Sequence, residues 1–146
     1  YIYFLTLIIR CMILGYSITY LNAEKFEIKE NINKLDINTS LNIKNIQEMK
    51  VQQEKKQQKV LKVDFEFLVN YEPKIGEIRI EGYLIYSGKD IEEILEKWQK
   101  DKKIENREFE IEVKNFILRR GVIISTFLSE YLAIHPPIPI PQILPK

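Results

Sequence analysis

Apolar and polar residues alternate with a period of two along three stretches in the middle of the chain. In the first stretch, from Leu35 to Ile43, the odd-numbered positions are aliphatic or threonine, and the even-numbered positions are Asp, Asn or Ser. The stretches 61–71 and 78–86 follow the same pattern and add aromatic residues. Because successive side chains of a strand point to opposite faces, this pattern is typical of half-buried antiparallel strands. Together with a shorter alternating stretch around Phe26, these three stretches predict four strands, at about 18–30, 34–46, 59–72 and 76–87.

Turn residues and a polar segment separate these strands. Pro73 and Gly76 predict a short hairpin between the last two strands. Residues 48–59 are rich in Gln and Lys. This segment either extends the two flanking strands into a long hairpin arm or forms a solvated linker.

Two helices are predicted after the strands. Asp90 with Glu93 three positions later is a capping-box pattern, which predicts a short helix at about 90–102. Apolar residues then recur at spacings of three and four, which predicts a long helix at about 106–134, although its first turns also alternate as a strand would. Gly121 interrupts this helix at a cost of about 1 kcal/mol relative to Ala, which indicates either a close helix contact or sequence drift.

The order of these elements predicts an α+β fold, in which a four-stranded antiparallel sheet packs with a short and a long C-terminal helix. At 146 residues, the chain is long enough for one domain. We expect that domain at 18–146, preceded at 1–17 by an apolar extension or a membrane segment. The long helix carries more apolar surface than one sheet requires, which predicts an oligomer.

The apolar run at 1–21 is long enough to cross a bilayer as a helix. Against that interpretation, Arg10 lies in its middle, where a charge costs about 2.5–3.5 kcal/mol. Met12 offers an alternative natural start, which makes the first eleven residues an upstream extension.

The composition argues against an enzyme. The net charge of +1 gives no electrostatic reason to expect nucleic acid as a partner. The single cysteine, Cys11, excludes an internal disulfide and a thiolate metal cluster, and the single histidine, His135, has no convergent ligands nearby. No nucleophile with a base and no glycine-rich phosphate loop is found. We therefore expect no catalytic residue, no metal and no cofactor.

The tail at 135–146 reads HPPIPIPQILPK and holds five of the six prolines. Prolines favour an extended polyproline II path, and a free tail leaves its aliphatic side chains in water. We predict that the tail is a strap that packs on its own sheet or on a neighbouring subunit. The alternative is a P-x-x-P ligand, but the basic residue that usually accompanies such ligands is only found at Lys146.

Several stretches of the chain resemble the SecB-like chaperone family. The stretches YLNAEKFEI, LDINTSLN, VLKVDFEFLVNY and EIRIEGYLIYSG resemble its four strands, and the region from 113 to 144 resembles its long helix and proline-rich end. The resemblance implies a homotetramer built as a dimer of dimers, with unfolded polypeptide bound along exposed apolar grooves. Two departures, the neutral to slightly basic charge and the absence of an Asn-Phe pair in the tail, argue against docking on an export motor.

The resulting functional prediction is an ATP-independent holdase for unfolded or precursor polypeptides, acting in protein export or in toxin–antitoxin control. One alternative is a membrane-anchored structural or interaction subunit that binds no clients, and another is a purely structural oligomer without clients. We expect a cytoplasmic protein, unless residues 1–21 associate with a membrane. Core packing is the competing interpretation for every predicted client-binding residue. These residues are Ile37, Leu41, Ile43, Trp98, Ile124, Phe127 and Tyr131.

Overall fold

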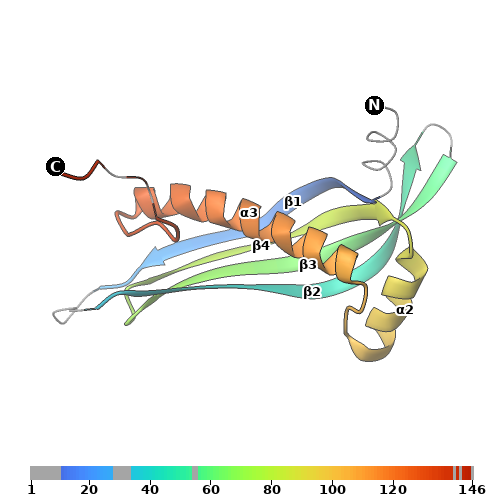
Figure 1. Cartoon of the computed structure of the whole chain (residues 1–146), viewed down its shortest axis with the longest axis horizontal. Coiled ribbons are helices and arrows are strands. Elements are labelled where there is room, and N and C mark those ends of the chain that lie inside the picture. Colours follow the sequence, from blue (N-terminus) through green and yellow to red (C-terminus); the bar gives the residue numbers. More distant parts are fainter. Residues whose placement is uncertain (1–10, 28–33, 54–55, 140, 142, 146) are drawn as a thin grey trace.

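The structure is a computed structural model that describes residues 11–27, 34–53, 56–139, 141 and 143–145. In this part of the chain, four strands are followed by two helices (Figure 1). The elements are β1 (Cys11–Lys25), β2 (Asp36–Gln53), β3 (Lys56–Glu72), β4 (Gly76–Gly88), α2 (Ile91–Asp101) and α3 (Arg107–Tyr131). The strands form one antiparallel sheet, so the predicted α+β fold class is confirmed.

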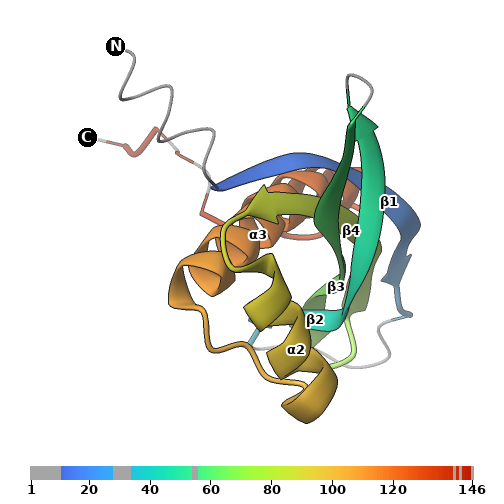
Figure 2. The same cartoon turned by 90° about the vertical axis from the view of Figure 1, so that its right-hand side faces the viewer.

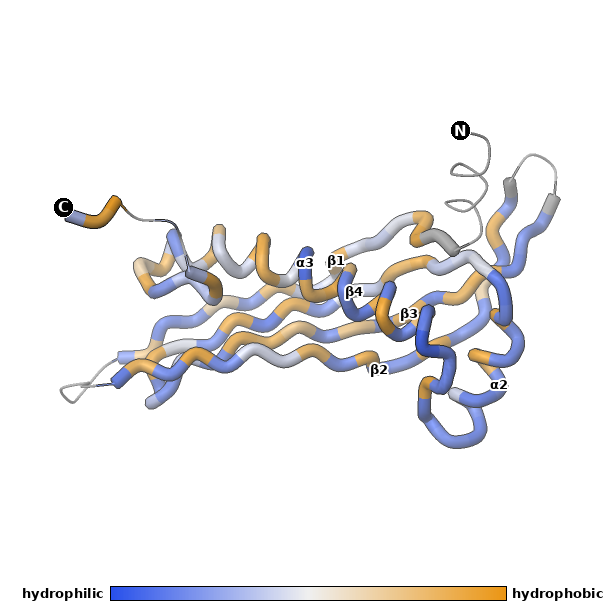
Figure 3. Tube along the Cα trace, in the orientation of Figure 1, coloured by the Kyte–Doolittle hydropathy of each residue, from blue (hydrophilic) through white to orange (hydrophobic). Residues whose placement is uncertain are grey.

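The strand order of the sheet is β1-β4-β3-β2, which leaves β1 and β2 as its two edges. The central strands β3 and β4 are joined by a tight turn, in which the backbone N–H of Ile75 donates to the carbonyl of Tyr71 at 2.9 Å. This is the hairpin that Pro73 and Gly76 predict. Figure 3 shows hydrophobic and hydrophilic residues alternating along the strands, as the sequence pattern indicates.

The core lies between one face of the sheet and α3, which runs along that face (Figures 1 and 2). Every fourth residue of α3 is buried, beginning with Phe109, whose ring meets that of Tyr86 edge-on with 4.8 Å between centroids. The buried stripe of the helix continues through Val113, Ile117, Gly121, Ser125 and Ser129. The buried side chains of the two central strands include Val63, Phe65, Phe67, Val69, Tyr71, Ile78, Ile80, Leu84 and Tyr86.

β1 begins at Cys11, well before the predicted start near residue 18, so this boundary was wrong. The strand pairs with the whole of β4, from Cys11 opposite Gly88 to Lys25 opposite Gly76. Register shifts at 13–15 and 18–20 interrupt the pairing. Each bulge moves the following side chains to the other face, so the strand shows no continuous alternation that a sequence pattern could detect. Half of the apolar run at 1–21 therefore belongs to the sheet, and residues 1–10 lie outside the described residues.

Of the two alternatives for 48–59, the structure has the long hairpin arm. β2 continues to Gln53 and β3 starts at Lys56, with these two residues paired across the arm. The predicted strands at 34–46 and 59–72 were therefore too short. Polar residues predominate in this arm, so hydrophobic alternation does not mark it as strand.

The helices match the prediction except at their ends. α3 ends at Tyr131, earlier than the predicted 134, and Ala133 then adopts a left-handed backbone with φ of 54°. At its start, the side chain of Asn106 accepts a hydrogen bond from the Phe109 N–H at 3.1 Å. Asp90 precedes α2 but makes no capping bond, because its own backbone is left-handed with φ of 62°, whereas capping residues are normally extended. The predicted capping box was therefore wrong.

Candidate functional site

The edge strand β2 places a row of aliphatic side chains on the face of the sheet that carries the core. Ile37, Leu41 and Ile43 lie opposite Tyr71, Phe67 and Phe65 of β3, all of which are buried. The three aliphatic side chains are only half-buried, because no further strand follows β2 in the described sheet. β2 therefore offers apolar side chains at alternate positions together with an open backbone edge.

The first groove along β2 lies between the strand and the end of α2. It has a volume of about 360 Å³ and is lined by Leu41, Asn42, Ile43, Trp98, Lys102, Lys103, Ile104, Glu110 and Lys114. We call it the β2–α2 groove. Trp98 is only 7% exposed, and its indole N–H donates to Asn45 Oδ1 at 3.2 Å. This bond ties α2 to the edge strand and leaves the tryptophan as a wall of the groove.

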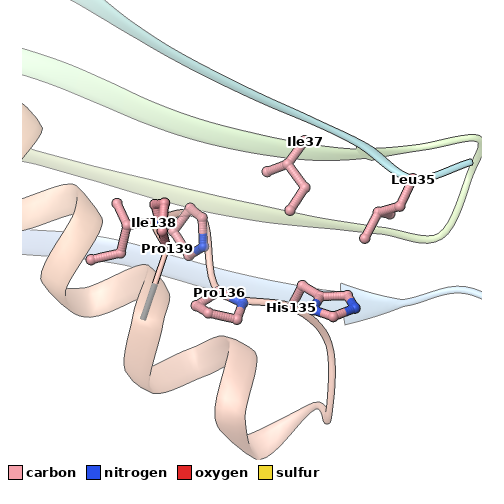
Figure 4. Close-up of a pocket in the computed structure, with 7 residues that line it drawn as sticks. Leu35, Ile37, His135, Pro136, Ile138 and Pro139 are labelled. Carbon is pink, nitrogen blue, oxygen red and sulfur yellow. The ribbon is translucent and has the colours of Figure 1, made fainter. Parts of the chain in front are cut away.

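The second groove lies at the start of β2, where the tail returns to the sheet (Figure 4). It has a volume of about 650 Å³ and is lined by Leu35, Ile37, His135, Pro136, Pro137, Ile138 and Pro139. We call it the tail groove. The hydroxyl of Tyr71 donates to the backbone carbonyl of His135 at 2.6 Å, which holds the tail next to the sheet. Burial raises the pKa of Tyr71 to about 12, so this donor keeps its proton at neutral pH.

The tail becomes more exposed along its length. Pro136 and Pro137 are half-buried, whereas Ile138 is 41% exposed. Ile143 and Leu144 are 101% and 76% exposed, so they do not pack on the chain's own sheet as a complete strap requires. The expected burial of these two side chains on the chain's own sheet was wrong, and the alternative, packing on a neighbouring subunit, stays a prediction. The predicted burial of Ile140 falls on a residue outside the described part of the chain.

The remaining predicted residues lie on the second half of α3 and line neither groove. Phe127 and Tyr131 are 67% and 87% exposed, and Ile123 joins them at 45% exposure with the same spacing of four residues. They form an apolar stripe on the outer side of the helix, which we call the outer α3 stripe. Ile124 is half-buried and packs against the core.

The structure thus brings Leu41, Ile43 and Trp98 into one groove and places Ile37 in the next. Sequence reasoning missed the lysines and Ile104 of the β2–α2 groove. Nothing in a linear pattern marks them. Lys102, Lys103 and Ile104 come from the connection between α2 and α3, Lys114 comes from α3, and all four meet β2 only through the tertiary fold. Leu35 of the tail groove was visible in the alternation of β2, although it was not among the predicted residues.

The opposite face of the sheet is charged. Lys44 Nζ lies 2.6 Å from Glu81 Oε1 and 3.5 Å from Glu66 Oε2, and Arg79 lies 3.7 Å from Glu66. The hydrogen bond from Lys44 holds the pKa of Glu81 below its usual range. On this face, the two basic side chains are thus paired with carboxylates.

The described part of the chain holds neither a cluster of metal ligands nor a membrane-spanning helix. Its residues include no group of three or more His, Cys, Asp or Glu side chains that could hold a metal ion. None of its helices is long and apolar enough to cross a membrane.

Comparisons with known proteins give one similarity of fold. No protein-family model matches the chain, and no curated protein matches it in sequence. Among solved structures, the chain is similar to the SecB-like chaperone Rv1957 of Mycobacterium tuberculosis, described in complex with a ChAD peptide from the antitoxin HigA1 (Rv1956). The TM-score is 0.53 at 11% identity, over 94% of this chain and 93% of the other. The chain therefore has the fold of a SecB-like chaperone.

Proposed function

We propose that this protein is a chaperone that binds extended, non-native polypeptides along β2 without ATP. The observation that carries the proposal is the open edge of β2. Aliphatic side chains at alternate positions of this strand line two open grooves. An extended peptide can add to a sheet edge through backbone hydrogen bonds, while pockets accept every second side chain. Such a surface selects for composition and extended conformation, and it needs no catalytic group.

The solved structure of similar fold supports this proposal, because it is a chaperone with a bound peptide. Its peptide comes from an antitoxin, which makes toxin–antitoxin control one setting for the present chain and protein export the other. The genes next to this one distinguish between the two settings. A cytoplasmic location is part of the proposal.

Self-association into a homotetramer, as a dimer of dimers, is the second part of the proposal. The outer α3 stripe supports it, because Ile123, Phe127 and Tyr131 leave a large apolar surface on the single chain. A second copy can cover this stripe without filling either groove along β2, because none of the three residues lines them. Native mass spectrometry at micromolar concentration tests this part, and a stable monomer contradicts it.

The client-binding part is tested by the aggregation of a chemically unfolded reporter enzyme. We expect the wild-type protein to delay aggregation at equimolar amounts without ATP. Leu41→Asn and Ile43→Asn should remove most of the delay, because both side chains line the β2–α2 groove. Ser40→Asn is the matched control, since Ser40 is exposed on the other face of the same strand.

Circular dichroism must accompany the assay to show that each variant remains folded. A wild-type protein that forms its oligomer but leaves aggregation unchanged contradicts the proposed function. Equal loss of the delay in Ser40→Asn would place client binding elsewhere than the groove.

A further inference from the structure

The β2–α2 groove combines an apolar floor with positive charge at its rim. Leu41, Ile43 and Ile104 are half-buried, and together with Trp98 they supply the apolar surface. The exposed side chains of Lys102 and Lys103 lie above it on the connection between α2 and α3. The groove is therefore shaped for a ligand that has apolar side chains and negative charge close together.

The positive charge at this rim is not neutralised by the described part of the chain. Glu110 is the only carboxylate that lines the groove, and it is bound to Lys114 at 2.8 Å. Asp101 and Glu105 flank the two rim lysines in sequence, but both bind Lys97, at 2.6 and 3.0 Å. Lys102 and Lys103 are consequently left without a carboxylate partner among the described residues.

The position of Lys102 is fixed by its backbone. It ends α2 in a left-handed conformation with φ of 56°, and its N–H donates to the carbonyl of Trp98 at 2.9 Å. Its ammonium group lies 5.6 Å from the centre of the Trp98 ring. The charge is thus held over the wall of the groove, next to the edge of β2. In contrast, Lys44 on the opposite face forms ion pairs with two carboxylates, those of Glu66 and Glu81.

We propose that the β2–α2 groove selects extended peptides in which apolar residues at alternate positions are flanked by Asp or Glu. The apolar side chains occupy the space between Leu41, Ile43 and Ile104, and the flanking carboxylates meet Lys102 and Lys103. This inference rests on the proposed function and specifies its substrate class. Charge complementarity favours such a peptide over a second copy of this chain, whose net charge is +1.

The test compares three short labelled peptides by fluorescence anisotropy. All have Leu at alternate positions with Ser between, and they differ only in flanking Glu, Gln or Lys. At low salt, we expect the Glu peptide to bind roughly threefold to tenfold more tightly than the Gln peptide, because two exposed ion pairs form. The Lys peptide should bind most weakly, and high salt should reduce the differences.

The double variant Lys102→Gln/Lys103→Gln should remove the preference for Glu while keeping the affinity for the Gln peptide. The matched control is Lys89→Gln/Lys100→Gln, which removes the same charge from exposed positions that do not line the groove. Equal affinity of the wild type for the Glu and Gln peptides overturns the inference. An equal loss of the preference for Glu in the control variant also overturns the inference, because the preference then depends on net charge and not on the groove.

Two further outcomes separate this inference from the proposed function. If the wild type delays aggregation of the unfolded reporter but binds none of the peptides, the function stands and the groove is not the selective site. If the rim substitutions change the oligomeric mass, a second copy occupies the groove and the inference is wrong. If neither the reporter nor any peptide is bound, the proposed function and this inference fail together.

Discussion

Gly121 of α3 lies directly against the ring of Phe67 on β3. A Cβ atom added to the glycine would lie 2.6 Å from Phe67 Cδ1, which is closer than side chains pack. The sequence pattern indicates either a close helix contact or drift at this position. The structure shows a close contact, and its partner is the sheet and not a second helix. The glycine lets α3 approach β3 at the centre of the core.

Gly121→Ala should destabilise the protein by about 1–2 kcal/mol. Overpacking of a core costs about 1–3 kcal/mol, and the better helix propensity of Ala returns up to about 1 kcal/mol. The free energy of unfolding in urea measures the change. Gly15→Ala is the control, because nothing lies within 4 Å of a Cβ added to Gly15. A variant at 121 that is more stable than wild type would show that the contact does not constrain the helix.

Ser125 and Ser129 provide a matched pair one helical turn apart. Both are buried, and Ser129 Oγ donates to the Thr126 carbonyl at 2.8 Å, whereas Ser125 Oγ has no partner within the described residues. Ser125→Ala should therefore be neutral or stabilising, and Ser129→Ala should cost about 0.5–1.5 kcal/mol. Thermal unfolding of the two variants checks this order. Equal destabilisation by both would indicate that Ser125 has a partner such as a buried water.

Tyr71 makes stability sensitive to alkaline pH. Its pKa is raised to about 12 in the folded chain, against about 10 in an unfolded chain. The unfolded state thus loses this proton first, so the contribution of Tyr71 is complete below about pH 10 and is lost as pH rises towards 12. Tyr71→Phe should be less stable at pH 7, because the bond to His135 is lost, and its stability should fall less steeply above pH 10. Parallel curves of unfolding free energy against pH for wild type and Tyr71→Phe would contradict this prediction.

The contact between tail and sheet predicts different effects for two deletions. Removal of 136–146 should lower the melting temperature, by about 4 °C for each kcal/mol lost, because it uncovers Leu35 and Ile37. Removal of 143–146 should leave the melting temperature unchanged, since Ile143 and Leu144 are exposed. Differential scanning calorimetry distinguishes them. Equal melting temperatures for all three chains would show that the tail adds no stability.

Much of the fold could be predicted because β3 and β4 are half-buried along their length. Their alternation reports directly which side chains face the core. The predicted start of β1 came too late in the sequence. The bulges at 13–15 and 18–20 move the following side chains from one face of the strand to the other and so interrupt the alternation. The sequence pattern did not distinguish a hairpin arm from a linker between β2 and β3, because the residues there are mainly polar.

The candidate site was predictable only where it coincides with a regular apolar pattern, either the alternation of β2 or the apolar stripe of α2 that contains Trp98. Leu41 and Ile43 stand out in the sequence, and the structure places both in the β2–α2 groove. The rim lysines could not be predicted, because their approach to β2 depends on how α2 docks on the edge strand through Trp98 and Asn45. Which of these residues contact a client stays a prediction.

Hydrogen exchange of the two sheet edges, with and without an unfolded client, tests the central claim most directly. Peptides from β2 around Leu41 and Ile43 should exchange more slowly when the client is present, because its backbone pairs with the open edge. Peptides from β1 serve as the internal control and should exchange at the same rate in both samples. Unchanged exchange in β2, or slowing confined to β1 or α3, would contradict the claim that clients bind along β2.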